Sequence, residues 1–216
     1  MTDQNFEAMR RAMVESQLRT TGVNDPRVVA AMASVPREHF VAVERRALAY
    51  TDRPVPLGPG RALNMPEATG LLLTEAAVRP ADKVLLVGAA SGYTAALLDR
   101  LAAKVVALEE DADLVALART ALSDTRVELV EGALNRGWAA AAPYDLIVVD
   151  GLIEHVPDAL VDQLADNGRL ACAILDRDTS RLAIGRKSGT AFGLDLFADC
   201  EAAPIPGFAK PKSFVF

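Results

Sequence analysis

An apolar segment of this chain ends in a run of small residues that is typical of a ligand-binding turn. Residues 84–93 read VLLVGAASGY, and Glu109 closes the next apolar segment, 21 residues after Gly88. A glycine at a strand end lets the backbone approach a ligand closely, and N–H groups at the start of the following helix favour anions. The spacing to Glu109 is typical of a carboxylate that accepts hydrogen bonds from ribose hydroxyls. These residues predict an adenosine site, and the alternative is a tight turn beside a solvated acid.

The elements that must position these residues alternate regularly along the chain. Strands are predicted over 83–88, 104–110, 126–132, 144–151 and 168–175. Helices are predicted over 65–78, 92–103, 112–123 and 156–165. The alternation predicts an α/β protein with a mostly parallel sheet and helices on both faces, in which ligands bind beyond the carboxyl ends of the strands. Residues 181–208 predict further strands that close one sheet edge in antiparallel orientation.

The N-terminal part of the sequence predicts helices of its own. Apolar residues recur at helical spacing in the first forty residues. Asn24 or Asp25 is suited to cap the second helix, which has Pro26 in its first turn and ends at Pro36. Residues 50–62 hold three Pro and two Gly, and predict a loop.

Composition bounds the class of protein. The 216 residues carry a net charge of −6, which argues against nucleic acid as the main partner because phosphate binding needs clustered Lys and Arg. The N-terminus lacks the apolar core of a signal peptide, and no apolar run approaches the roughly 20 residues that a membrane span needs. We therefore expect a cytoplasmic protein with no membrane partner.

Neither the cysteines nor the histidines point to a metal. Cys172 and Cys200 match no disulfide or zinc pattern, and are expected to be reduced thiols. His155 follows the fourth predicted strand and has Asp150 and Glu154 nearby in the sequence. Such a set indicates a metal only weakly, and a solvated loop is the preferred interpretation.

Five segments together resemble protein-L-isoaspartate O-methyltransferases in order and spacing. They lie at residues 17–41, 49–60, 84–98, 132–151 and 156–170, and include the VPREHF and APYD motifs. The resemblance implies a Rossmann-like methyltransferase core over 63–216 with an N-terminal helical extension and loop over 1–62, as one structural unit. It implies S-adenosyl-L-methionine as cofactor, and damaged proteins or peptides with isoaspartyl carboxylates as methyl acceptors. The cofactor-binding residues that it implies are Gly88, Ala89, Ser91, Gly92, Tyr93, Glu109, Gly132, Ala133 and Leu134.

Several polar or glycine positions of the family differ in this chain. In the family loop E-I-G-T-G-S-G-Y, the position of the acid is occupied here by Leu86 and the position of the middle glycine by Ala90. The family Gly-Asp-Gly after the third strand reads Gly132-Ala133-Leu134, which removes a contact to adenine.

The acceptor side of the expected site differs as well. The family segment Q-T-I-S-Q-P corresponds to RALNMP at 61–66. Asn64 replaces a serine and is expected to orient the reacting groups, since its amide donates and accepts hydrogen bonds. Arg61, Met65 and Asp150 are expected to contact the acceptor; the alternatives are a solvated Arg61 and a turn-capping Asp150.

The altered site leaves three hypotheses open. The chain is an isoaspartyl methyltransferase, a methyltransferase for another acceptor, or a non-catalytic binding module that keeps the fold. In the second hypothesis, Arg61, Asn64 and Asp150 determine the altered specificity.

Overall fold

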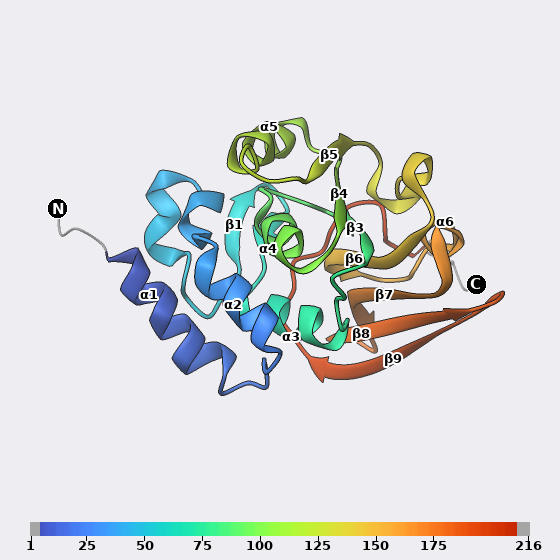
Figure 1. The fold of residues 1–216 in the computed structure, drawn as a ribbon, viewed down its shortest axis with the longest axis horizontal. Coiled ribbons are helices and arrows are strands. Elements are labelled where there is room, and N and C mark those ends of the chain that lie inside the picture. Colours follow the sequence, from blue (N-terminus) through green and yellow to red (C-terminus); the bar gives the residue numbers. More distant parts are fainter. Residues whose placement is uncertain (1–4, 211–216) are drawn as a thin grey trace, which may run out of the picture.

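The computed structural model, which describes residues 5–210, is built on a seven-stranded sheet in the order β5-β4-β3-β6-β7-β8-β9 (Figure 1). The strands are β3 (Lys83–Val87), β4 (Lys104–Glu109), β5 (Glu128–Glu131), β6 (Tyr144–Ile153), β7 (Leu164–Asp176), β8 (Thr179–Ser188) and β9 (Ala191–Asp199). The pairs from β5 to β7 are parallel, whereas β7, β8 and β9 pair antiparallel. The predicted parallel sheet and its antiparallel edge are confirmed.

Helices precede the sheet and alternate with its strands. They are α1 (Phe6–Met13), continued by a π-helical segment (Val14–Leu18), α2 (Pro26–Ser34), α3 (Pro66–Glu75), α4 (Tyr93–Leu101), α5 (Ala112–Ala121) and α6 (Asp158–Asp162). Short 3₁₀ helices cover Arg37–Phe40, Val43–Leu48, Leu134–Arg136 and Ala139–Ala141. Of the two predicted caps of α2, Asp25 is the one that acts, because its carboxylate accepts a 2.8 Å hydrogen bond from the Arg27 N–H.

Two predicted segments are wrong in part. The predicted helix over 156–165 is only the short α6, because Leu164 already pairs with Tyr144 as the first residue of β7. The predicted loop over 50–62 contains most of a hairpin, β1 (Val55–Gly58) and β2 (Arg61–Leu63).

Both hairpin strands turn one face into the protein, which explains why a segment rich in Pro and Gly is ordered. Val55 and Leu63 face each other across the hairpin and are both buried. Gly60 has a φ of 69°, a left-handed conformation that glycine adopts without strain. Arg61 lies on the same face of β2 as Leu63, since side chains alternate along a strand.

The sheet separates two apolar layers. Val84 and Leu86 of β3 face a core that is shared with residues of α1 to α5. Leu85 and Val87 face the other layer, which contains side chains from α6 and from the C-terminal segment. The N-terminal helices thus share a core with the sheet, and the expected division at 62/63 falls within β2.

The strand register brings the polar residues of interest into one row. Val87 pairs with both Leu108 of β4 and Val149 of β6. The next residue on each strand is therefore Gly88, Glu109 or Asp150, at the carboxyl edge of the sheet. The chain extends the sheet from β3 to β4 and β5, and then returns to the other side of β3 with β6. Such a reversal is where open α/β sheets bind ligands.

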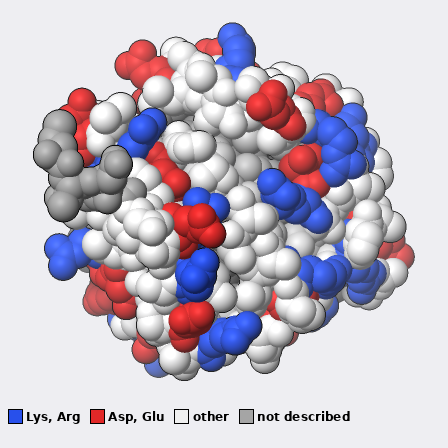
Figure 2. Space-filling model, turned by 60° about the vertical axis from the view of Figure 1, so that its left-hand side comes forward, with Lys and Arg blue, Asp and Glu red and all other residues white. Residues whose placement is uncertain are grey.

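The surface carries both signs of charge. Figure 2 shows acidic and basic side chains interspersed over the face that it presents. In the part of the chain that the structure describes, no helix has the length and apolar character required to cross a membrane. Cys172 and Cys200 are free thiols, as predicted.

Candidate functional site

The turn after β3 has the backbone conformation of a ligand-binding turn. Gly88 and Gly92 have φ values of 80° and 98°, and Ala90 has a φ of 50°, which is unusual for a residue with a side chain. The N–H groups of Gly88 and Ala89 both donate to the Leu108 carbonyl, at 3.0 Å each. These bonds hold the turn against the end of β4, where Glu109 follows.

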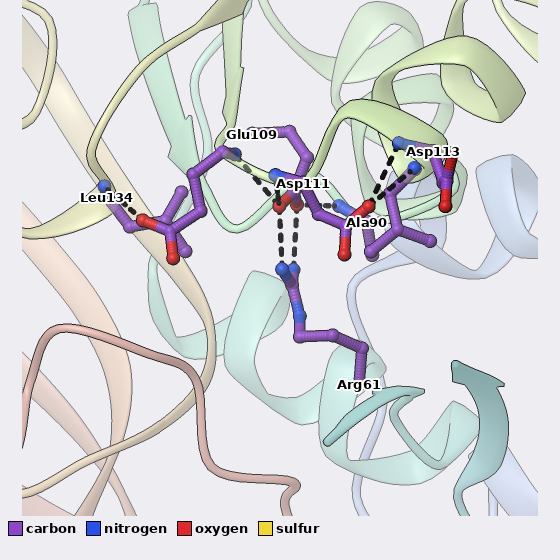
Figure 3. Close-up of polar contacts among 8 residues, drawn as sticks. Arg61, Ala90, Glu109, Asp111, Asp113 and Leu134 are labelled. Carbon is purple, nitrogen blue, oxygen red and sulfur yellow. Dashed lines mark hydrogen bonds and ion pairs between the residues drawn. The ribbon is translucent and has the colours of Figure 1, made fainter. Parts of the chain in front are cut away.

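Glu109 is fully buried and receives five hydrogen bonds (Figure 3). Arg61 binds both carboxylate oxygens, with Nη1 2.6 Å from Oε1 and Nη2 2.7 Å from Oε2. The Ala90 N–H donates to Oε2 at 2.7 Å. The N–H groups of Glu110 and Asp111 donate to Oε1 at 2.9 and 3.1 Å. The carboxylate therefore joins the hairpin, the turn after β3 and the start of α5.

Both partners of this pair are held in the charged state. Burial opposes the charge of Glu109, but the hydrogen bonds and charge of Arg61, with backbone N–H groups, outweigh it and lower the pKa of the carboxyl below 4.5. Burial likewise opposes the charge of Arg61, and Glu109 outweighs it and raises the pKa of the guanidinium. Arg61 is only 7% exposed, so the alternative of a solvated side chain is wrong.

An open cavity of about 560 Å³ lies beside this ion pair. Its walls are the hairpin turn at 59–61, the acids Glu110 and Asp111, and residues 204–206. Its volume is in the range of small-molecule sites. A Cβ on Gly88 would lie 3.5 Å from Ile205 Cδ1 and 3.8 Å from Arg61 Nη2. The guanidinium thus separates the turn and Glu109 from the open space.

The second acid of the row, the half-buried Asp150, receives side-chain hydrogen bonds from neutral groups. Asn64 Nδ2 donates to its Oδ1 at 2.8 Å, and Thr94 Oγ1 donates to its Oδ2 at 2.6 Å. Asn64 Oδ1 accepts from the Ala203 N–H at 3.3 Å. Asp150 at the edge of β6 therefore binds α4 through Thr94 and the segment before α3 through Asn64, which in turn binds the C-terminal segment at Ala203. These long-range contacts are not those of a simple turn cap.

Asp150 is shifted in the opposite direction from Glu109. Burial raises the pKa of its carboxyl above 3.8, and the hydrogen bonds from Thr94 and Asn64 offset this only in part. The space beside the pair Asn64–Asp150 measures about 10 Å³. A space of this size has room for about one water molecule, so this end of the site is closely packed.

A buried arginine, Arg37, binds the backbone of Asn64, the residue that donates to Asp150. Arg37 is fully buried, donates from Nε to the Ala49 carbonyl at 2.6 Å, and donates from Nη2 to the Asn64 carbonyl. Its guanidinium lies 4.7 Å from the centre of the Tyr93 ring, which packs edge-on against Phe40. The structure thus places Tyr93, a predicted cofactor contact, in the core beside the turn.

The segment after β5 lies next to the same edge. The Gly132 N–H donates to the Glu109 carbonyl at 3.0 Å, and the Leu134 N–H donates to Glu110 Oε2 at 3.2 Å. Ala133 is exposed, whereas the Leu134 side chain is fully buried. Ser91 is buried in the turn, and its hydroxyl has no hydrogen-bond partner in the described part of the chain.

The remaining predicted residues lie at the margins of the row or away from it. Met65 precedes α3 and is half-buried. His155 Nδ1 is 3.0 Å from the Phe208 carbonyl, and Glu154 accepts from the Lys210 N–H at 2.8 Å. Within residues 5–210, no group of three or more His, Cys, Asp or Glu is arranged to hold a metal ion.

Thr94 and Arg37 were not among the predicted site residues. Thr94 is the second residue of α4, where a hydroxyl can face the strand end from which the turn departs. Arg37 belongs to the VPREHF motif, where Glu38 and His39 follow it, and nothing in this polar run indicates that its guanidinium is buried.

The chain is similar to one group of proteins over nearly its whole length. The family model described as "Protein-L-isoaspartate(D-aspartate) O-methyltransferase (PCMT)" matches residues 8–197. A Koribacter versatilis protein named protein-L-isoaspartate O-methyltransferase is 38% identical over 205 residues, covering 94% of this chain and 92% of the relative. A protein of the same name from Methanoculleus marisnigri is 40% identical over 176 residues, covering 80% of each.

Solved structures are similar in fold. A structure titled protein-L-isoaspartate O-methyltransferase superimposes with a TM-score of 0.79 at 20% identity, covering 92% of this chain and 66% of that one. A Plasmodium falciparum structure, titled as a putative enzyme of the same name in complex with S-adenosyl-L-homocysteine, has a TM-score of 0.77 at 20% identity and covers 93% of this chain and 98% of that one. These likenesses confirm the predicted Rossmann-like fold.

Proposed function

The chain belongs to the protein-L-isoaspartate O-methyltransferase family, and we propose that it transfers a methyl group from S-adenosylmethionine to isoaspartyl carboxylates of damaged proteins and peptides. The observation that carries the proposal is the similarity in sequence to this family over residues 8–197. The methyl ester then collapses to a succinimide, which can reopen as normal aspartate. A cytoplasmic location fits repair of this kind and belongs to the same proposal.

The cofactor side of the proposal rests on the turn and on Glu109. S-adenosylmethionine would supply an electrophilic methyl group on a sulfonium, with a neutral thioether as the leaving group. The left-handed Gly88 and Gly92 and the cavity beside Glu109 fit a nucleoside cofactor. Glu109 is the residue that would accept the ribose hydroxyls, and the segment Gly132–Leu134 would border the adenine.

The acceptor side rests on Asn64 and Asp150. The acceptor carboxylate is an anion at neutral pH, so no general base is required and the chain's contribution is orientation and charge. The Asn64 amide can orient the reacting oxygen. Burial raises the pKa of Asp150, whose Oδ1 accepts from the same Asn64 amide. The buried guanidinium of Arg37, which donates to the Asn64 carbonyl, adds a positive charge close to Asn64 and Asp150.

Methyl transfer is tested with two matched peptides, one with isoaspartate and one with normal aspartate at the same position. With labelled S-adenosylmethionine, we expect base-labile methyl ester on the isoaspartyl peptide alone. Asn64→Ala is expected to lower kcat about tenfold while the protein still binds S-adenosylhomocysteine. Ester on neither peptide, with cofactor binding intact, would contradict isoaspartate as the acceptor.

A non-catalytic binding module is the second candidate function. Two observations favour it. The Glu109 oxygens are already occupied by hydrogen bonds from Arg61, and the space beside Asn64 and Asp150 holds about one water. Failure of the purified protein to bind S-adenosylhomocysteine at millimolar concentration would favour this candidate over the first.

A further inference from the structure

We propose that Arg61 competes internally with the cofactor: its guanidinium occupies the Glu109 oxygens that the ribose hydroxyls need, so the cofactor binds only when Arg61 has left. The inference rests on the proposed function, and concerns how access to that site is controlled. An ionised carboxylate offers about four lone-pair positions. Glu109 already receives five donors, two of them from Arg61. A ribose diol therefore has no free acceptor until the arginine withdraws.

The structure provides a place for the displaced side chain. Arg61 forms part of the wall of the 560 Å³ cavity, and the exposed residues Glu110 and Asp111 line the same space. Asp111 Oδ1 also caps α5, where it accepts from the N–H groups of Asp113 and Leu114 (Figure 3). A guanidinium that swings into this cavity exchanges a buried anion for solvated ones. Glu109 meanwhile keeps its three backbone N–H donors, from Ala90, Glu110 and Asp111. The buried charges thus have partners both in the closed state, with Arg61 on Glu109, and in the open state, with Arg61 in the cavity.

The closed state has a measurable consequence for affinity. When only a fraction of the protein is competent to bind, the apparent dissociation constant rises by the reciprocal of that fraction. Removing the guanidinium should remove this factor. Arg61→Gln shortens the side chain and replaces the guanidinium by one uncharged NH₂ group, and Arg61→Met leaves no donor.

A second buried ion pair supplies the matched control. Arg169 of β7 donates to Asp82, and both side chains are less than 5% exposed. Asp82 immediately precedes β3, so this pair lies at the amino-terminal edge of the sheet, opposite the site. Arg169→Gln therefore removes an equally buried guanidinium without touching Glu109.

The experiment is calorimetric titration of S-adenosylhomocysteine into four proteins: wild type, Arg61→Gln, Arg61→Met and Arg169→Gln. We expect the two Arg61 variants to bind at least about tenfold more tightly than wild type, and Arg169→Gln to bind like wild type. Circular dichroism melts establish that each variant is folded. Equal or weaker affinity in both folded Arg61 variants would overturn the inference, and methyl transfer by wild type would then leave the proposed function standing. Absence of binding by all four proteins would overturn both.

A second measurement tests that the gain comes from the ribose hydroxyls. Thermal shifts are recorded with millimolar adenosine and with 2′,3′-dideoxyadenosine, for wild type and Arg61→Met. We expect the variant to gain a larger shift than wild type with adenosine only, because the dideoxy compound cannot donate to Glu109. An equal gain with both nucleosides would show that Arg61 blocks the cavity by volume, and would overturn competition for the carboxylate.

Discussion

Glu109 and Asp150 follow the same register level of β4 and β6, the two strands that flank β3, yet their carboxyl groups are shifted in opposite directions. Glu109 lies beside a 560 Å³ cavity and is ionised by a bidentate arginine and three backbone donors. Asp150 lies beside space for one water and receives hydrogen bonds from the neutral groups of Asn64 and Thr94. The pKa of Glu109 is lowered and that of Asp150 is raised. Burial raises the pKa of both carboxyls, and the partners of each decide the net direction of the shift.

The largest expected effect comes from neutralising the charged acid. Glu109→Gln should lower the free energy of unfolding by about 3 kcal/mol, because it leaves the Arg61 guanidinium without its partner. The amide of glutamine would also direct a donor toward donors, since N–H groups converge on both oxygens. Urea unfolding at neutral pH measures this loss. Arg61→Gln should cost less, because Glu109 keeps three backbone donors; equal losses would contradict this account of the pair.

The acid dependence of unfolding sharpens the same contrast. A carboxyl whose folded pKa is lowered contributes stability that is present above its unfolded pKa, near 4.5, and is lost as the pH falls through the folded value. Wild type should therefore lose stability more steeply than Glu109→Gln as the pH falls below about 4.5. Parallel pH profiles of the two proteins would show that Glu109 is not held in its charged form.

Thr94→Val is expected to destabilise the neutral network by about 1.5 kcal/mol. The substitution keeps the volume of the side chain, but removes the 2.6 Å hydrogen bond to Asp150 Oδ2. Losing that bond should also raise the pKa of Asp150 further, so the destabilisation should grow with pH. Chemical unfolding at pH 5 and pH 8 measures both effects. A loss that is equal at the two pH values would mean that Asp150 has the same charge in both.

Asp150→Asn should raise the free energy of unfolding by about 1 kcal/mol at pH 8. An acid whose folded pKa is raised contributes stability below its unfolded pKa, near 3.8, and loses it as the pH rises through the folded value. The asparagine can accept from Asn64 and donate to Thr94, whose hydroxyl can reorient. The gain should vanish near pH 4. A loss at pH 8 would mean that the ionised form of Asp150 is required by its surroundings.

The positions of Gly88, Glu109 and Asp150 at one edge of the sheet could be predicted from the sequence, whereas the side chains that bind the two acids could not. The alternating strands and helices predict the parallel sheet, and with it the positions of Gly88 and Glu109 at one edge. The Arg61–Glu109 pair joins residues 48 apart through a hairpin that Pro and Gly made resemble a loop. On β2 only Arg61 and Leu63 alternate onto the buried face, which is too short a pattern to predict a strand or a buried arginine from the sequence. Nothing local indicates that Thr94 and Asn64 meet at Asp150, since that contact depends on packing between α4 and the approach to α3.

The smallest expected effect separates the turn from the acid that it holds. Ala90 has a φ of 50°, and relief of this left-handed strain by Ala90→Gly is partly offset by the greater entropy that glycine gives the unfolded chain. We expect a net stabilisation of about 0.5 kcal/mol, measured by thermal unfolding. The Ala90 N–H still donates to Glu109 in the variant, and Arg61 still occupies both oxygens, so affinity for S-adenosylhomocysteine should change less than about twofold. A large gain in affinity from Ala90→Gly would mean that the conformation of the turn, rather than Arg61 on Glu109, limits binding of S-adenosylhomocysteine.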